Sequence, residues 1–226
     1  MKVVCISDTH NQHDKVELPE GDVLVHSGDF SGTGTLKQVI SFTKWFASQP
    51  HPHKILVAGN HDITLDISFY DSNWHRFHNK CLSASDIKNF VLRSGVHYLE
   101  NSGVEIEDVK FYGSPCQPTF CNWAFNVDRG LPIRSVWSKI PEDTDVLITH
   151  GPPRGVGDVL QTGESVGCDD LWDAVKRVRP QYHIFGHIHE GYGLHTREGI
   201  SFVNPSICDH NYKVVNSPLV FEVSNE

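Results

Sequence analysis

Five short apolar runs in this chain each lead directly into residues that can bind a metal ion. The runs span residues 3–7, 23–27, 55–58, 146–149 and 184–185. Near-continuous runs of Val, Ile and Leu are typical of strands buried in an open α/β sheet. Sheets of this kind bind ligands in the crevice outside the carboxyl ends of their strands. The sequence therefore predicts an α/β fold with a ligand site at the edge where these five strands end.

Two aspartates, one asparagine and four histidines follow these runs. They are Asp8, His10, Asp29, Asn60, His150, His187 and His189. Oxygen and nitrogen donors without cysteine suit Mn, Fe, Zn or Co. Two such ions about 3.5–4 Å apart clamp phosphoryl oxygens and lower the pKa of a bound water toward about 7. We therefore predict a site for two divalent ions, bridged by the central Asp29, at which hydroxide attacks a phosphoester.

His61 and Asp62 follow Asn60 directly and are candidates for catalysis. Hydrolysis needs a proton donor for the leaving group, and an imidazole beside the metals suits that role. We predict His61 for this step, with Asp62 as the residue that orients its ring. A lone histidine after a strand is usually an ordinary polar residue, and an aspartate there is often a turn former. Seven such residues in one register argue against chance, whereas His26 and His183 are expected to be structural.

Length and charge limit the partners of the chain. Its 226 residues suffice for one well-packed domain, which we predict to span residues 1–226. The net charge of −9 argues against binding of a nucleic acid polymer, which needs a basic face. No apolar stretch approaches the roughly 18 residues of a membrane span, and the first residues already form a strand instead of a signal peptide. We expect a cytoplasmic protein with no membrane partner, either a monomer or a small homo-oligomer.

The order of the predicted elements favours two sheets. Predicted strands lie near residues 2–7, 22–26, 54–58, 145–149, 182–186, 192–196, 200–204 and 214–223, and predicted helices cover 35–49, 85–94, 131–139 and 169–178. Ser85 is the expected N-cap of the second helix, and a tight turn is expected at 101–103 within the strand-rich stretch 96–113. Helices separate the early strands, but the later strands follow one another. This pattern favours two packed sheets covered by helices over one doubly wound sheet.

The motifs resemble a known family. Asp8-x-His10, Gly28-Asp29, Gly59-Asn60-His61-Asp62, His150-Gly151 and Gly186-His187-x-His189 resemble, in this order, the pattern of the calcineurin-like metallophosphoesterases. The stretches 113–115, 122–126, 150–153 and 185–193 resemble its metallophosphoesterase-domain-containing (MPPED) subgroup. The resemblance covers nearly the whole chain. It implies a four-layer α/β/β/α sandwich, with two mixed sheets flanked by helices, and a phosphodiesterase that depends on Mn²⁺ or a similar ion.

The resemblance also implies a ligand assignment. One ion would be held by Asp8, His10, Asp29 and His189, and the other by Asp29, Asn60, His150 and His187, with His61 at the scissile phosphate. Some members have glycine in place of the histidine that this chain keeps at His187. That histidine favours a competent enzyme over a catalytically weak nucleotide-binding relative. Residues 30–34 lack the Asp-Arg-Gly segment of protein phosphatases, which argues against protein dephosphorylation.

The expected substrate is a small phosphodiester, with cyclic or simple nucleotides first. Residues 116–129 form a long aromatic segment, and such loops are usually functional. Phe120 or Trp123 could stack a base, although Trp123 could equally belong to a small core beneath the loop. Further candidate substrate contacts are Asn60, His61, Asn126, Arg129, Arg154 and Tyr192. A phosphatase for another small phosphate compound and a non-catalytic binding protein remain alternatives, as does the choice between 2′,3′- and 3′,5′-cyclic nucleotides.

Overall fold

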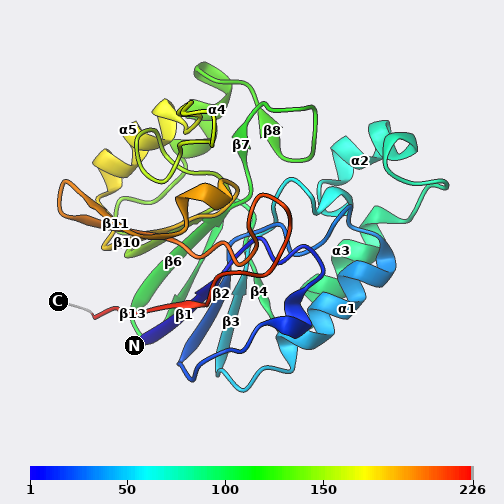
Figure 1. Cartoon of the computed structure of the whole chain (residues 1–226), viewed down its shortest axis with the longest axis horizontal. Helices are drawn as coiled ribbons and strands as arrows, with labels where there is room; N and C mark the ends of the chain where they lie inside the picture. The colour runs from blue at the N-terminus through cyan, green and yellow to red at the C-terminus, as the bar shows by residue number, and fades with distance from the viewer. Residues whose placement is uncertain (225–226) are drawn as a thin grey trace.

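A computed structural model describes residues 1–224 and contains two large mixed sheets (Figure 1). The first sheet has the strand order β13 (Leu219–Glu222), β1 (Lys2–Ile6), β2 (Val23–His26), β3 (His53–Leu56) and β4 (His97–Tyr98). Strands β1 to β4 run parallel, and β13 runs antiparallel to β1 at one edge. The parallel strands therefore all present their carboxyl ends at the same edge of the sheet.

The second sheet is built in the same way from the later part of the chain. Its order is β11 (Gly193–Arg197), β12 (Ile200–Asn204), β10 (Tyr182–Ile184), β9 (Val146–Thr149), β6 (Val109–Ser114) and β5 (Ser102–Ile106). The four inner strands are parallel, and β11 and β5 are antiparallel to their neighbours at the two edges.

Side-chain alternation along the strands explains how the two sheets pack. Successive residues of a strand point to opposite faces of its sheet. Val3 and Cys5 of β1 therefore face the second sheet, where they share a buried core with Ile148 and Ile184. Val4, between them, lies in a different core on the helical side of the first sheet. The near-continuous apolar runs of the sequence thus reflect strands that are buried on both faces.

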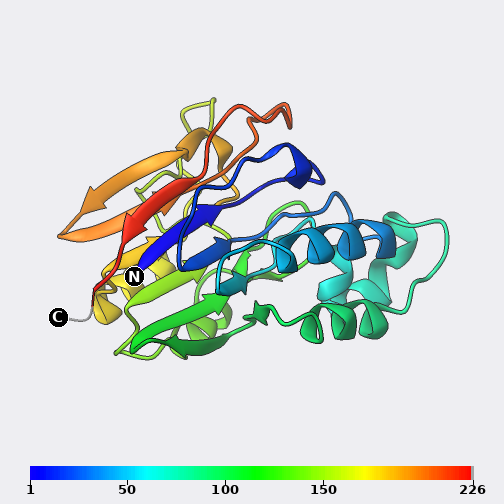
Figure 2. The ribbon, with the colours of Figure 1, turned by 90° about the horizontal axis from the view of Figure 1, so that it is seen from below.

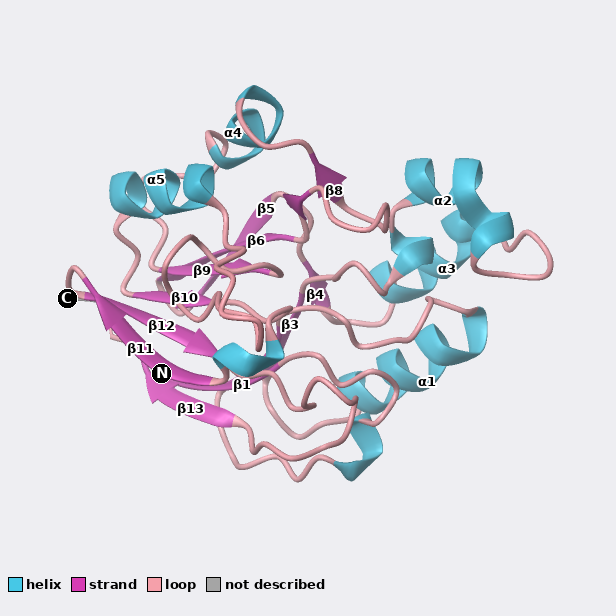
Figure 3. Ribbon diagram, turned by 45° about the horizontal axis from the view of Figure 1, so that its top comes forward, coloured by secondary structure: helices cyan, strands magenta, loops and turns pink. Residues whose placement is uncertain are grey.

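Helices cover the outer face of each sheet. Helices α1 (Leu36–Ala47) and α3 (Ala84–Leu92) pack on the first sheet, and α4 (Leu131–Trp137) and α5 (Asp169–Val178) pack on the second. Figure 2 shows α1 in blue and α3 in green together on one side of the strands, and Figure 3 places α4 and α5 on the other side. The predicted four-layer α/β/β/α sandwich is confirmed.

Capping residues set where these helices begin. Thr35 and Gln38 form a capping box at the start of α1, each side chain bonding the other residue's backbone N–H. The N-cap of α3 is Ser83, which accepts from Asp86 N, so the predicted cap at Ser85 was wrong by two residues. Ser83 and Ser85 both come before the apolar residues Ile87 and Val91 of this helix. The sequence pattern therefore does not distinguish them, and the N-cap is identified only from the backbone conformation.

The sequence also missed or misplaced several short elements. Helix α2 (Ile67–Asn73), the pair β7 (Gln117–Pro118) and β8 (Asn126–Val127), and the 3₁₀ turns His13–Lys15, Ile63–Leu65, Trp74–Arg76 and His189–Gly191 were not predicted. The tight turn expected at 101–103 lies instead at Glu107 and Asp108, where both residues have left-handed φ values of 47° and 65°. Two residues in this conformation match the right-handed twist of a hairpin. Within residues 1–224, no helix has the length and apolar character needed to cross a bilayer.

Candidate metal centre

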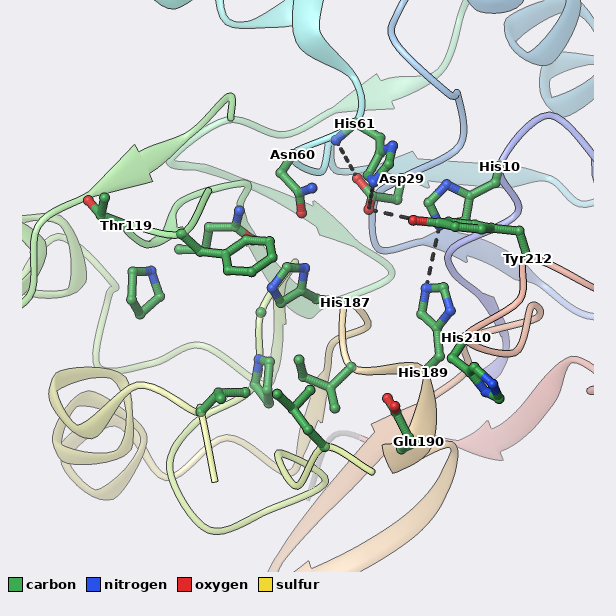
Figure 4. A pocket seen from close by; sticks show the side chains of 18 of the residues that line it. His10, Asp29, Asn60, His61, Thr119, His187, His189, Glu190, His210 and Tyr212 are labelled. Carbon is green, nitrogen blue, oxygen red and sulfur yellow. Dashed lines mark hydrogen bonds and ion pairs between the residues drawn. The ribbon is translucent and has the colours of Figure 1, made fainter. Parts of the chain in front are cut away.

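The seven predicted ligands lie in the loops that leave the carboxyl ends of β1, β2, β3, β9 and β10, and the structure brings them together (Figure 4). Six of them, together with His61, form overlapping groups whose ligand atoms lie within 4.8 Å of one another. These groups are Asp8, His10 and His189; Asp29, His150 and His187; and His10, Asp29 and His61. Asn60 joins them through its Oδ1, which lies 3.0 Å from His150 Nε2.

Asp29 lies at the centre of the cluster. Its Oδ2 is 3.3 Å from His150 Nε2 and 4.0 Å from the Nε2 atoms of both His10 and His61. His10 Nε2 also lies 3.4 Å from His189 Nε2, and His189 Nε2 lies 3.3 Å from Asp8 Oδ1. A carboxylate placed between two groups of imidazoles has the position that a bridging ligand requires.

The second ring nitrogen of three histidines is bound to the backbone. His150 Nδ1 lies 3.0 Å from the Ser27 carbonyl, His189 Nδ1 lies 2.9 Å from the Asp209 carbonyl, and His61 Nδ1 lies 2.9 Å from the Gly32 carbonyl. A carbonyl oxygen only accepts, so each Nδ1 carries the proton and donates it. Nε2 of each ring then faces the cluster, which is the orientation of metal-binding histidines, whose Nε2 gives its lone pair to the cation in place of a proton.

Four of the seven ligands have left-handed backbone conformations. The φ values are 52° for Asp8, 41° for His10, 57° for Asp29 and 67° for His187. Non-glycine residues seldom adopt this region, although Asp and His do so more readily than most. Strained residues of this kind cluster at functional sites, where the surrounding structure holds them in place.

Glycines next to the ligands allow the loops to pack closely. A Cβ atom at Gly186 would collide with Ser7 Oγ and with the carboxylate of Asp8, and a Cβ atom at Gly59 would collide with Asp29 Oδ1. These glycines are needed for the close approach of neighbouring loops, and the Gly186 contact brings a loop of the second sheet against a loop of the first.

The electrostatics of the cluster come from its two carboxylates. Burial disfavours the charged form of His150, but the adjacent Asp29 carboxylate outweighs burial and raises the pKa of His150 to about 9. Burial likewise opposes the charge on His189, and Asp8 raises its pKa to about 9. Burial alone would raise the pKa of Asp8 and of Asp29, yet the neighbouring histidines hold both below the ordinary value.

The donor set fits two divalent cations. Burial lowers the pKa of His10 to about 4 and that of His187 to about 3, so both rings are neutral and keep a lone pair for a metal. Buried carboxylates seldom occur without a cation or a paired charge to balance them. Oxygen and imidazole donors in this number suit Mn, Fe, Zn or Co.

Asp62 does not orient His61, contrary to the prediction. Its carboxylate accepts from Asp29 N at 3.0 Å, Gly59 N at 2.8 Å, Ser31 N at 3.0 Å and Ser31 Oγ at 2.7 Å. The His61 ring is held instead by Gly32, as described above. Burial and the charge of Asp29 raise the pKa of Asp62 to about 7, against the hydrogen bonds from Gly59 and Ser31, which favour the carboxylate form. Asp62 therefore fixes the backbone of the loops that carry Asp29 and Asn60.

His26 and His183 lie buried inside strands and outside the metal groups, as expected. His26 Nε2 is 3.0 Å from Thr9 Oγ1, and its Nδ1 accepts from Gly28 N at 3.2 Å. His183 Nε2 is 2.9 Å from Thr149 Oγ1. His26 thus supports two metal-binding loops from below.

A cavity of about 350 Å³ opens over the cluster. Besides the cluster residues, its wall contains the apolar side chains of Pro118, Phe120, Leu160 and Val166 and the polar side chains of Glu190, His210 and Tyr212. Figure 4 shows His187 between Thr119 on one side and Tyr212 and His210 on the other, with His189 beside His210. The Phe120 side chain is half-exposed, and its ring centroid lies 5.6 Å from that of His187.

Three other residues predicted to bind substrate lie in or behind this wall. Trp123 packs behind His61, with ring centroids 4.4 Å apart, and does not line the cavity. Asn126 donates to the Phe120 carbonyl at 2.7 Å and so holds the aromatic segment in shape. Arg129 lines the cavity, but its guanidinium donates to the carbonyls of Val166 and Gly167.

Arg154 and Tyr192 lie outside the cavity wall, and their predicted substrate contacts are not supported. The Arg154 guanidinium donates to Ser165 and pairs with Asp169 at 3.1 Å. The Tyr192 hydroxyl donates to the Ser217 carbonyl at 3.0 Å. Both side chains are used to fasten loops. Sequence reasoning also missed Tyr212, because the irregular loop after β12 carries no periodicity or motif that would have indicated it.

The fold and the site define the chain as a metallophosphoesterase. A family model described as Calcineurin-like phosphoesterase matches residues 1–191, and the chain belongs to this family of metal-dependent phosphoester hydrolases. It is 41% identical over 230 residues to Metallophosphoesterase domain-containing protein 1 of Homo sapiens, covering 98% of this chain and 71% of that protein.

Two further comparisons agree with this assignment. The chain is 39% identical over 237 residues to UPF0046 protein T07D4.2 of Caenorhabditis elegans, covering 99% of this chain and 60% of that protein. A solved crystal structure matches with a TM-score of 0.64 and 15% identity over 91% of this chain and 90% of the other. At that identity the match establishes the fold alone.

Proposed function

We propose that this chain is a phosphodiesterase that uses two divalent metal ions to hydrolyse small phosphodiesters. Cyclic or simple nucleotides are the first candidate substrates. The proposal rests above all on the cavity lining, in which Phe120 lies beside His187 and Tyr212 lies beside His10, at two different parts of the metal cluster. A phosphodiester carries two organic groups on its phosphorus, and these two places offer a surface for each of them. A volume of about 350 Å³ is in the range of small-molecule sites.

The charges around the cavity favour a diester over a monoester. A diester carries one negative charge at neutral pH, whereas a monoester carries nearly two. Arg129 is the one lysine or arginine among the described residues of the cavity wall, and its guanidinium is already bonded to two carbonyls. Glu190 adds a negative charge to the same wall. No lysine or arginine of the described wall is therefore free to balance the second charge of a monoester.

The residues of the chain have distinct roles in the proposed reaction. When bound, the two cations supply polarisation of the phosphoryl oxygens and a water of lowered pKa, and Mn²⁺ is the first candidate. Asp8, His10, Asp29 and His189 would hold one cation, and Asp29, Asn60, His150 and His187 would hold the other. His61, whose Nε2 lies 4.0 Å from Asp29 Oδ2, would deliver a proton to the leaving oxygen. Phe120 would stack an aromatic group.

The test compares hydrolysis of bis-p-nitrophenyl phosphate and p-nitrophenyl phosphate by protein with and without Mn²⁺, beside elemental analysis of the purified protein. We expect Mn²⁺-stimulated turnover with preference for the diester, and a nucleotide phosphodiester panel then defines the substrate. Preference for the monoester would transfer the assignment to a phosphatase. Absence of metal-stimulated turnover in folded protein would support a binding protein on this fold.

Two variants separate catalysis from metal binding. His61→Ala should keep its metal content and lose turnover by about 100-fold or more, in the usual range for a general acid. Asp29→Asn should lose both ions, because its carboxylate would serve both. His75→Ala, at a site outside the metal groups, is the matched histidine control. Loss of metal from His61→Ala would reassign His61 as a ligand.

A further inference from the structure

Tyr212 lies over the metal cluster although nothing in the sequence pointed to it. Its ring packs edge to face against His10, with centroids 4.7 Å apart, and lies 6.1 Å from His61 and 6.0 Å from His189. Half of the side chain is exposed, and it lines the cavity. The residue is therefore in contact with the site and open to a ligand.

The backbone around Tyr212 is held firmly in place. Its N–H donates to the Asp209 carbonyl, the same oxygen that accepts from the ring of His189. The Asp209 carboxylate accepts from the backbone of Asn211 and Lys213, and Gln12 donates to the Tyr212 carbonyl. These bonds keep Tyr212 at a left-handed φ of 57°. The loop thus fixes a metal-cluster histidine and this tyrosine through one shared oxygen.

The hydroxyl group of Tyr212 is directed into the site. Figure 4 shows it pointing across His10 toward Asp29 and His61. It has no hydrogen-bond partner among residues 1–224, whereas nearby backbone donors are already engaged. The His61 N–H donates to Asp29, and the His187 N–H donates to Asp8. An uncommitted donor beside a site for anionic phosphoryl groups can make a strong, charge-assisted hydrogen bond to a ligand oxygen.

We infer that the Tyr212 hydroxyl donates a hydrogen bond to a phosphoryl oxygen of the bound ester and so positions the phosphorus over the metal cluster. The inference rests on the proposed function and adds Tyr212 to His61 and Phe120 as a residue that contacts the substrate. Tyrosine suits this role because its hydroxyl remains a neutral donor well above neutral pH, and the ring against His10 limits where the oxygen can lie.

The test uses Tyr212→Phe, which removes the hydroxyl and keeps the ring against His10. The matched control is Tyr182→Phe. In the wild type the Tyr182 hydroxyl donates to the Glu222 carbonyl at the end of the second sheet that lies away from the metal cluster. Three quantities are measured on Mn²⁺-loaded protein: kcat/KM for bis-p-nitrophenyl phosphate, the calorimetric Kd of inorganic phosphate, and the metal content. Loss of one hydrogen bond to a charged group corresponds to about tenfold to 100-fold.

We expect Tyr212→Phe to weaken phosphate binding and kcat/KM by about tenfold or more at unchanged metal content, with Tyr182→Phe equal to wild type. If the wild type fails to hydrolyse diesters but phosphate binding still depends on this hydroxyl, the proposed function fails and the inference stands. Three results would overturn the inference: equal phosphate affinity in Tyr212→Phe and wild type, no phosphate binding to the wild type, or metal loss in Tyr212→Phe.

Discussion

Removing the Asp62 carboxylate tests whether this residue supports the metal loops or takes part in proton transfer. The carboxylate is fully buried and accepts from the backbone N–H groups of Asp29, Ser31 and Gly59 and from the Ser31 hydroxyl. Two of these backbone groups flank or belong to metal ligands. Asp62→Ala would leave three buried N–H groups without their acceptor.

The expected loss of stability follows from these bonds. A buried donor left without a partner costs about 1–3 kcal/mol, so three of them should lower the free energy of unfolding by at least about 3 kcal/mol. That is a large part of the roughly 5–15 kcal/mol that holds a typical domain folded. The Asp62→Asn side chain has one acceptor oxygen, which can serve one pair of donors, either Asp29 N with Gly59 N or the two Ser31 groups. Its N–H₂ group then faces the other pair, so we expect about half of the loss in unfolding free energy that Asp62→Ala causes.

The assay is urea unfolding of metal-free protein followed by circular dichroism, with metal content measured after Mn²⁺ loading. Asp71→Ala is the control, because Asp71 is exposed and surface substitutions usually change stability by less than about 0.5 kcal/mol. Asp62→Ala should be less stable and bind less metal, in the order wild type, Asn, Ala. A variant with wild-type unfolding and full metal content but little turnover would refute this reasoning and return Asp62 to the role of orienting His61.

Three further outcomes are expected. The pKa of about 9 that Asp29 imposes on His150 means that a cation must displace a proton below that pH, so the apparent Mn²⁺ affinity, measured by competition with a chelating dye, should rise from pH 6.5 to 8.5; a flat profile would contradict the assigned ligand. Phe120→Ala should raise KM for aromatic diesters about fivefold or more with little change in kcat, since stacking contributes about 1–3 kcal/mol per ring, and steady-state kinetics showing an unchanged KM would exclude stacking. Gly186→Ala should abolish metal binding or folding, because its Cβ would meet the Asp8 carboxylate; elemental analysis and thermal unfolding indistinguishable from wild type would show that the loops can separate.

The strand register made most of the fold and the cluster predictable. Parallel strands end at a common edge, so polar residues after apolar runs had to meet there, as Asp29, His150 and His187 do. The two packed sheets followed from the succession of late strands. These inferences depend on the spacing of apolar residues and on the order of the elements along the chain, and both can be read directly from the sequence.

The cavity wall was less predictable, because side-chain partners depend on contacts that are distant in the sequence. Arg154 and Tyr192 occupy plausible loop positions, yet each donates to a neighbouring loop instead of a ligand. Tyr212 lies in a loop without pattern, and its place over His10 depends on the Asp209 carbonyl. The predicted partner of His61, Asp62, was wrong for the same reason. The actual partner is the carbonyl of Gly32, which lies 29 residues away in the sequence.

Each half of the sandwich contributes part of the metal cluster. Asp8 and Asp29 leave the first sheet, and His150 and His187 leave the second. Cations bound by ligands from both sheets would link the sheets at one end. Removal of the metal would then lower the free energy of unfolding. The two groups of ligands leave sheets that are separated by an apolar layer, and Val25 and Ile148 lie in that layer. We therefore expect a change of side-chain volume at Val25 or Ile148 to alter the spacing of the ligands, although neither residue is one of them.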